Sequence, residues 1–386
     1  MSAGRKILVV TAIPLVIASL AIGTSYEYVR GAAFVIQAAG MEGTARSLAE
    51  WHAVAVSEAE ATVPVRDGSL RARVYRAASV SGPPVLVVPG VHAGGIDEPR
   101  LITFARDVAS TGRHVVAAEL PDLKAYAITP RTTGHIEDAA RWLANGSGLA
   151  ADGRIGLMGI SFAGGLSLVA ATRAGLRDHV AFVMSFGGHG DLPRTLRYLC
   201  TGEVPGGGNR PPHDYGVAII LLGVADRVVP ADQAEPLRDA IRAFLNASHV
   251  AMVDEARAAV EFERARTMAE QLPEPARTLM KYVNDRDVGR LGPLLLPHTA
   301  DLGGDPALSP SQAATPTFPV YLLHGIDDNV IPAVESELLG ETLRSAGAEV
   351  SQLSTPLITH AEVDRAPGAG AVWELVQFWA NLLDER

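Results

Sequence analysis

The sequence has a single cysteine, Cys200, among its 386 residues. This excludes an intramolecular disulfide, and it also excludes a zinc or iron–sulfur site built on several thiolates. Histidine and carboxylate side chains do not replace the missing ligands, because the sequence contains no H-E-x-x-H segment and no tight His/Asp cluster. The sequence therefore predicts neither a metal nor another cofactor.

Positive charge is also scarce. The 33 Lys and Arg residues face 43 Asp and Glu residues, which gives a formal net charge of -10, and the basic residues are scattered singly. A nucleic-acid partner is not expected, since its binding needs a basic stripe or patch. Aromatic residues make up only 5% of the chain but hydrophobic residues 48%. This composition excludes a disordered or coiled-coil protein and favours a globular chain with a large core.

The longest uncharged segment lies near the N-terminus. Residues 7–26 follow Arg5 and Lys6 and carry no charge, and a helix of this length spans about 30 Å of hydrocarbon. We expect residues 1–30 to form a single-pass signal anchor, with the positive pair in the cytoplasm and the remaining chain outside it. Cleavage near 21–23, which would release a secreted form, and a buried core helix are the alternatives.

A helical linker over 31–59 is predicted next, and short apolar runs then alternate with amphipathic helical segments. The expected strands are 61–65, 70–75, 84–88, 114–118, 154–158, 180–186, 320–323 and 350–353. Most lack in–out alternation, which is typical of a parallel sheet covered on both faces. The pattern predicts a doubly wound, mostly parallel α/β sheet in two parts, 60–200 and 313–386. Residues 201–312 have helical spacing and are expected to form a cap insertion.

One serine lies between a predicted strand and a predicted helix. The strand at 154–158 continues into Gly159-Ile160-Ser161-Phe162-Ala163-Gly164. Small residues around a serine at such a turn allow a strained backbone that exposes the hydroxyl above the sheet. The helix that follows favours negative charge developing on a substrate oxygen. The sequence therefore predicts Ser161 as a nucleophile rather than as an ordinary helix cap.

A serine hydroxyl needs a base, and the base needs an acid to orient it. His360 follows the last predicted strand, and Asp328 follows the strand before it. Both residues are thereby expected at the sheet edge where Ser161 emerges. The chain order Ser161, Asp328, His360 is the one that this topology produces.

These motifs resemble those of α/β-hydrolase-fold serine hydrolases, including esterases, lipases and dienelactone-hydrolase-like enzymes. The resemblance covers roughly residues 60–200 and 315–386, and it implies the Ser161, Asp328 and His360 triad. It also implies an oxyanion hole made by the backbone N–H groups of Val91 and Phe162, since Pro89-Gly90 takes the place of the family's His-Gly. Ser161 departs from the dienelactone hydrolases, which use cysteine.

Three other residues near these motifs have competing interpretations. Asp226 repeats the spacing of the Asp328 segment, with a Gly three residues before it and a Pro four residues after it. No strand followed by histidine comes after Asp226, so a structural role is expected and catalytic acid is the alternative. His92 and His189 follow strands near the site and are expected to be solvated loop residues.

The sequence thus favours a membrane-anchored hydrolase that cleaves a small-molecule ester or related acyl substrate through an acyl-enzyme. The Leu, Ala and Met residues of the cap favour an apolar substrate. Peptidase or acyltransferase activity on the same triad is one alternative. A non-catalytic, membrane-anchored binding protein is another, although a fold without chemistry has no need of all three triad groups.

Overall fold

The computed structural model describes residues 26–251, 254–358 and 369–386. Most of the expected N-terminal anchor lies outside these ranges, and so does His360. Within the described ranges, no helix has both the length and the apolar character needed to cross a bilayer. The chain is helical from residue 26 to residue 38, and we call this segment the N-terminal helix.

The centre of the molecule is an eight-stranded sheet with the order β1-β2-β4-β3-β5-β6-β7-β8. The strands are β1 (Val56–Val65), β2 (Gly68–Ala77), β3 (Val85–Val88), β4 (Val115–Ala118), β5 (Ile155–Ile160), β6 (Val180–Phe186), β7 (Val320–Gly325) and β8 (Val350–Thr355). β1 and β2 form an antiparallel hairpin, β2 pairs antiparallel with β4, and β3 to β8 run parallel. The predicted doubly wound, mostly parallel sheet is confirmed.

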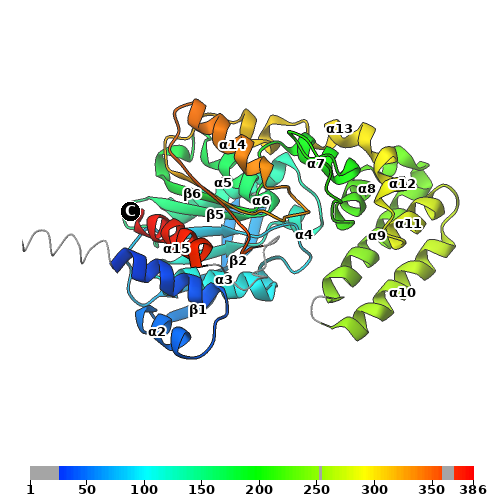
Figure 1. Ribbon diagram of the computed structural model, residues 1–386. Coiled ribbons are helices and arrows are strands. Elements are labelled where there is room, and N and C mark those ends of the chain that lie inside the picture. Colours follow the sequence, from blue (N-terminus) through cyan, green and yellow to red (C-terminus); the bar gives the residue numbers. More distant parts are fainter. Residues whose placement is uncertain (1–25, 252–253, 359–368) are drawn as a thin grey trace, which may run out of the picture.

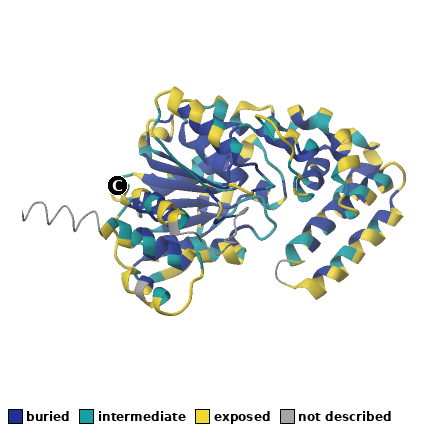
Figure 2. Cartoon of the chain, in the orientation of Figure 1, coloured by how far each residue is buried: buried dark blue, intermediate teal, exposed yellow. Residues whose placement is uncertain are grey.

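The continuous apolar strands are explained by two cores, one on each face of the sheet. In β3, Val85 and Val87 belong to a core that includes Phe34, whereas Leu86 and Val88 belong to the opposite core with Leu166. Neighbouring residues point to opposite faces, so a strand buried on both faces needs an apolar side chain at every position. Figure 1 shows helices on both sides of the sheet, and Figure 2 shows that its strands are buried.

Helices cover both faces of the sheet. One layer contains the N-terminal helix, α3 (Pro99–Ser110) and α15 (Ala369–Asp384), and the other contains α5 (Pro130–Asn145) and α6 (Phe162–Ala171). α2 (Thr44–His52) precedes the hairpin, α4 (Pro121–Lys124) follows β4, and α14 (Val334–Ser345) lies between β7 and β8.

Between β6 and β7 the chain leaves the sheet and forms helices. These are α7 (Leu192–Thr201), α8 (Tyr215–Val228), α9 (Ala231–Ala251), α10 (Glu255–Gln271), α11 (Ala276–Asn284), α12 (Val288–Leu295) and α13 (Thr299–Gly303). Figure 1 shows α8 to α12 beside the sheet domain, with α9 and α10 as a long hairpin. The segment 300–316, which returns the chain to the sheet, contains the end of α13 and the single turns Pro306–Leu308 and Pro310–Gln312.

One buried carboxylate opposes folding. Asp107 on α3 has a buried Oδ2 without a hydrogen-bond partner among the described residues, and burial raises its pKa from 3.8 to about 6. Between pH 3.8 and 6 the folded chain binds more protons than the unfolded chain, so stability falls as pH rises. We expect Asp107→Asn to raise the free energy of unfolding at pH 7.5 by about 1–2 kcal/mol.

Urea denaturation at pH 7.5 and pH 4 measures this gain. At pH 4 the wild-type carboxyl is mostly protonated in the folded state, so the advantage of Asp107→Asn is expected to disappear. A variant that is less stable than the wild type at pH 7.5 would contradict the prediction.

Candidate active site

Ser161 lies at a strained turn between β5 and α6. Its backbone has φ 57° and ψ -136°, and its N–H donates to the Phe186 carbonyl at 2.7 Å. A positive φ is uncommon for a side-chain-bearing residue, and such strain persists only where the surroundings impose it. The elbow thus has the conformation expected of a nucleophile on this kind of turn.

Two glycines make this turn possible. A Cβ on Gly159 would lie 2.3 Å from the Ala163 carbonyl oxygen, and a Cβ on Gly164 would lie 2.3 Å from the Ser185 Oγ. Both contacts are far shorter than van der Waals distance, so neither position accepts a larger residue without rearrangement. Ala163 itself is fully buried, and it fills the position where many elbows have a second glycine.

The loop after β3 passes directly against the elbow. A Cβ on Gly90 would lie 3.3 Å from both the Ser161 Cβ and the Ile160 carbonyl oxygen. The next residue is Val91, and Phe162 is the first residue of α6. Within the described ranges, neither the Val91 nor the Phe162 N–H donates a hydrogen bond to another protein group. The two amides therefore have no described partner that competes with the predicted oxyanion.

Asp328 is buried in the loop after β7 and is held in one orientation. Its Oδ1 accepts hydrogen bonds from the backbone N–H groups of Val330 at 2.8 Å and Ile331 at 3.0 Å. Its Oδ2 lies 3.4 Å from Nε2 of His324, and the other ring nitrogen of His324 lies 2.6 Å from the Ser336 Oγ. A carboxylate fixed by backbone donors loses little further entropy when it orients a base.

The register of the sheet brings the strand ends to one edge. Ile160 of β5 pairs with Phe186 of β6, which pairs with Leu323 of β7, and Gly325 of β7 pairs with Thr355 of β8. Ser161 and Asp328 both follow these paired ends. His360 comes five residues after β8 and lies outside the described residues, so its place in the site stays a prediction.

Asp226 occupies a different environment. It lies on α8 of the cap, with a side chain that is 57% exposed, and it pairs with Arg238 of α9 at 2.5 Å. The apolar run before Asp226 is helical and does not form a strand that ends at the sheet edge. This placement favours the structural role over that of catalytic acid.

His92 and His249 join the loop after β3 to the cap. Their rings lie perpendicular with centroids 4.3 Å apart, and Nδ1 of His92 accepts from the Gly94 N–H at 3.1 Å. The neutral ring of His92 therefore carries its proton on Nε2, which is buried without a hydrogen-bond partner among the described residues. His92 is half-buried against helix α9, so the expectation of a solvated loop residue holds only in part.

Acid is expected to disrupt this contact. Burial, with a smaller contribution from His249, lowers the pKa of His92 from 6.5 to about 4, while Glu98 opposes and Arg100 adds to that shift. Between pH 6.5 and 4 the unfolded chain binds more protons than the folded chain. The free energy of unfolding therefore decreases as the pH is lowered, by on the order of 2 kcal/mol at pH 4. Denaturation at pH 7 and pH 4 should show this loss.

His92→Asn serves as the matched variant, since it removes the titrating ring and keeps a polar side chain. The variant should lose less stability between pH 7 and pH 4 than the wild type does. Equal losses in the two proteins would show that His92 is not the group responsible.

His189 is also buried, contrary to expectation. Its Nε2 lies 2.7 Å from the Leu308 carbonyl, and its ring lies 5.5 Å from that of Phe162. The segment that follows is fixed by the buried carboxylate of Glu335, which accepts from the Gly190 N–H at 3.0 Å and from Arg194 at 2.6 Å. These bonds fix the entry to the cap relative to the sheet.

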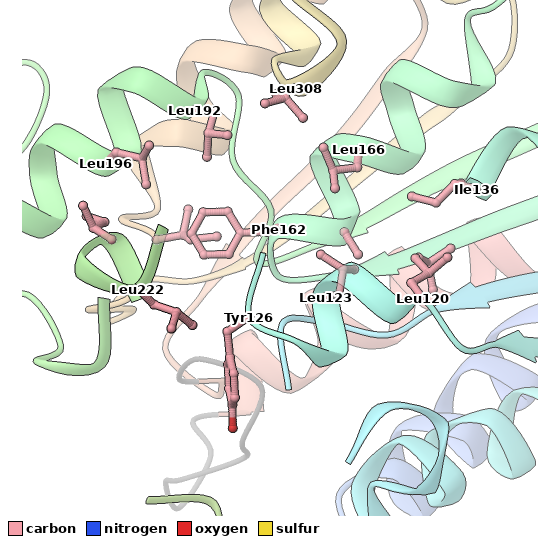
Figure 3. Packing of buried hydrophobic residues seen from close by; sticks show 14 of the residues in the cluster. Leu120, Leu123, Tyr126, Ile136, Phe162, Leu166, Leu192, Leu196, Leu222 and Leu308 are labelled. Carbon is pink, nitrogen blue, oxygen red and sulfur yellow. The ribbon is translucent and has the colours of Figure 1, made fainter. Parts of the chain in front are cut away.

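Aromatic residues that the sequence did not point to also border the elbow. Tyr126 has φ 62°, and its ring lies 5.9 Å from that of Tyr215 at the start of α8. Figure 3 shows the Phe162 ring directed from α6 toward Leu196 and Leu222 of the cap, with Tyr126 nearby. The surroundings of Ser161 are therefore apolar on the cap side.

Cys200 offers no alternative nucleophile. It is buried on α7, and burial raises its pKa to about 12. A thiol reacts as its thiolate, which is negligible at neutral pH under these conditions. No group of three or more potential metal ligands occurs among the described residues.

Comparisons with known proteins give matches among solved structures alone. No family model matches the chain, and no curated protein matches it. Among solved structures, an esterase from Pyrobaculum calidifontis is 18% identical with a TM-score of 0.44. The match covers 85% of this chain and 82% of the esterase chain. A thermostable esterase from Pseudomonas putida is 15% identical with a TM-score of 0.47, covering 91% of this chain and 87% of its own.

A dienelactone hydrolase described as putative, from Klebsiella pneumoniae, is 14% identical with a TM-score of 0.42, covering 86% of this chain and 98% of its own. At these identities and TM-scores, the similarity establishes neither the fold nor the activity of this chain. The assignment of the fold therefore depends on the strand order and on the turn at Ser161.

Proposed function

We propose that this α/β-hydrolase-like protein is a serine hydrolase that cleaves a carboxylic ester or a related acyl substrate. The observation that carries the proposal is the backbone of Ser161, which holds φ 57° at the end of β5. A strained serine turn and an oriented carboxylate that follow neighbouring strand ends of the sheet support nucleophilic catalysis.

In the proposed reaction, Ser161 Oγ attacks the acyl carbon while His360 accepts the serine proton. The carbonyl oxygen becomes an oxyanion that accepts hydrogen bonds from the Val91 and Phe162 N–H groups, and such a donor typically contributes about 3 kcal/mol in the transition state. The C–O bond to the leaving group breaks, and His360 returns the proton to the departing alcohol. Asp328 orients His360 and stabilises its charged form.

The second half of the reaction regenerates the enzyme. His360 removes a proton from water, and the resulting hydroxide attacks the acyl-serine. The tetrahedral intermediate then collapses, releasing the carboxylic acid and restoring the Ser161 hydroxyl with the proton held by His360. An apolar acyl group suits the surroundings of the site, because the side chains packed next to the elbow on the cap side, Phe162, Tyr126 and Leu222, are apolar.

The proposal includes the location of the protein. The uncharged residues 7–26 follow a positive pair, which supports a single-pass anchor with the catalytic domain outside the cytoplasm. Protease protection of sealed membrane vesicles tests this orientation. A domain digested from the cytoplasmic side would contradict it.

Labelling with a fluorophosphonate probe tests the catalytic proposal. The wild-type protein should react at one site per chain, and Ser161→Ala should not react at all. Ser167→Ala is the matched control, because Ser167 is a buried serine on the same helix whose hydroxyl has no hydrogen-bond partner among the described residues. Its labelling should equal that of the wild type. An unreactive wild type would favour the binding-protein alternative.

Substrate panels separate the remaining acyl chemistries. Hydrolysis of short p-nitrophenyl esters without cleavage of matched amides is the expected result. Faster amide cleavage would favour a peptidase, and product formed only with an added alcohol or amine acceptor would favour an acyltransferase.

A further inference from the structure

Exposed aromatic side chains gather where the described chain begins. Trp51 is 84% exposed, Tyr26 56% and Trp373 51%. Tyr28 stacks on Trp373 with ring centroids 5.2 Å apart, while Tyr26 and Trp51 lie 6.4 Å and 6.3 Å from the ring of His52. We call the exposed Tyr26, Trp51 and Trp373, together with the half-buried Tyr28, the aromatic collar. They come from three helices that are separate in the chain: the N-terminal helix, α2 and α15.

The exposure of the collar is unusual for this protein. Among the described residues, the other large hydrophobic side chains with comparable exposure outside residues 26–51 and α15 are Val80, Val260, Leu294 and Ile326, all aliphatic. Single exposed aliphatic residues are common on soluble surfaces, whereas a group of exposed aromatic rings marks an interaction surface.

The collar rests on a firmly packed support. A Cβ on Gly31 would lie 2.6 Å from the Val376 carbonyl oxygen, so the N-terminal helix approaches α15 closely enough to require glycine. Phe34 is buried, and its ring centroid lies 4.1 Å from that of Trp379. The exposed rings are therefore held in place by a buried interface.

The chain that enters this surface indicates what covers it. Residues 7–26 are uncharged and mostly apolar, and they join the folded domain at Tyr26, within the collar. Tryptophan and tyrosine concentrate at the membrane–water interface, where an apolar ring and a polar edge are both accommodated. Attraction to anionic lipid needs clustered Lys and Arg, but the charges of residues 26–52 are mixed: Glu27, Arg30, Glu42, Arg46 and Glu50.

We propose that the aromatic collar docks against the headgroup region of a phospholipid bilayer and fixes the domain close to the membrane surface. Zwitterionic phosphatidylcholine suffices for this contact, because the rings and not a basic patch make it. The proposal rests on the membrane anchor proposed above and not on the hydrolase activity.

Tryptophan quenching by spin-labelled lipid tests the docking. The full chain is reconstituted into phosphatidylcholine vesicles that carry a nitroxide either on the headgroup or deep in the acyl chain. We expect the headgroup label to quench emission more than the deep label. Most of that quenching should disappear in the double variant Trp51→Phe/Trp373→Phe, which leaves the partly buried Trp142 and the buried Trp379 in place.

A second measurement uses substitutions that remove the apolar rings. Trp51→Ser/Trp373→Ser should raise at least fivefold the rate at which an added protease cuts between the anchor and the domain of the vesicle-bound full chain, because the domain no longer stays against the bilayer. Val260→Ser, at a 68% exposed residue of the cap helix α10, is the control and should leave this rate unchanged. If the wild type binds vesicles but shows no quenching by the headgroup label, the anchor proposal stands and the docking of the collar is contradicted.

Two further outcomes would also overturn the proposal. A full chain that does not bind the vesicles would contradict both the anchor and the docking of the collar, whatever its reactivity toward the fluorophosphonate. Lipid-free dimers that dissociate in the serine double variant would assign the surface to a second copy of this chain.

Discussion

Asp328→Asn should lower kcat/KM for an ester substrate by about 10³- to 10⁴-fold, because the base loses the group that fixes its tautomer and stabilises its charged form. The substitution keeps the size of the side chain, and the amide oxygen can still accept from the Val330 and Ile331 N–H groups. The folded structure should therefore survive. Steady-state kinetics, with circular dichroism as a check on folding, measures the effect.

Asp226→Asn is the matched control, since it makes the same chemical change in a segment with the same local spacing. Asp226 forms a surface ion pair with Arg238, and such pairs contribute at most about 1 kcal/mol to stability. Its kcat/KM should stay within about twofold of the wild type. A larger loss at Asp226 than at Asp328 would reverse the assignment of the acid.

Gly159→Ala should destabilise the fold by at least about 3 kcal/mol or open the elbow, because the new Cβ meets backbone and not a movable side chain. That Cβ would lie 2.3 Å from the Ala163 carbonyl oxygen and 2.7 Å from the Gly164 Cα. Either outcome displaces Ser161, so fluorophosphonate labelling should fall together with the denaturation midpoint.

Gly370→Ala provides the control for this glycine substitution. Gly370 lies on α15, and a Cβ added there would have nothing within 4 Å among the described residues. Alanine favours a helix over glycine by up to about 1 kcal/mol, so the stability of this variant should equal or slightly exceed that of the wild type. A Gly159→Ala protein with normal stability and labelling would show that the elbow is wider than the structure has it.

The sequence predicted the strand ends at which the candidate site residues lie, because local patterns determine the strands. Ser161 and Asp328 each follow a short apolar run that becomes a buried parallel strand, and parallel strands end at one edge. The Asp226 segment has the same Gly–Asp–Pro spacing, and its apolar run could have been helix or strand because periodicity does not separate the two when a run is short. In the structure it is helical and belongs to the cap.

The contacts between cap and sheet could not be predicted in this way. His92 meets His249 only because α9 extends back toward the loop after β3, and the packing direction of a helix is a tertiary property. Tyr126 gave no signal either, since tyrosine seldom adopts a positive φ. Its conformation is imposed by its neighbours and not by its own preference.

The place where the cap joins the sheet has a practical consequence. The cap departs after β6 and returns at β7, and these two strands are hydrogen-bonded neighbours. A segment whose two ends emerge side by side can be excised or exchanged without changing the order of the strands. Chimaeras that carry a foreign lid on this scaffold should therefore keep the strained turn at Ser161 while altering which molecules reach it.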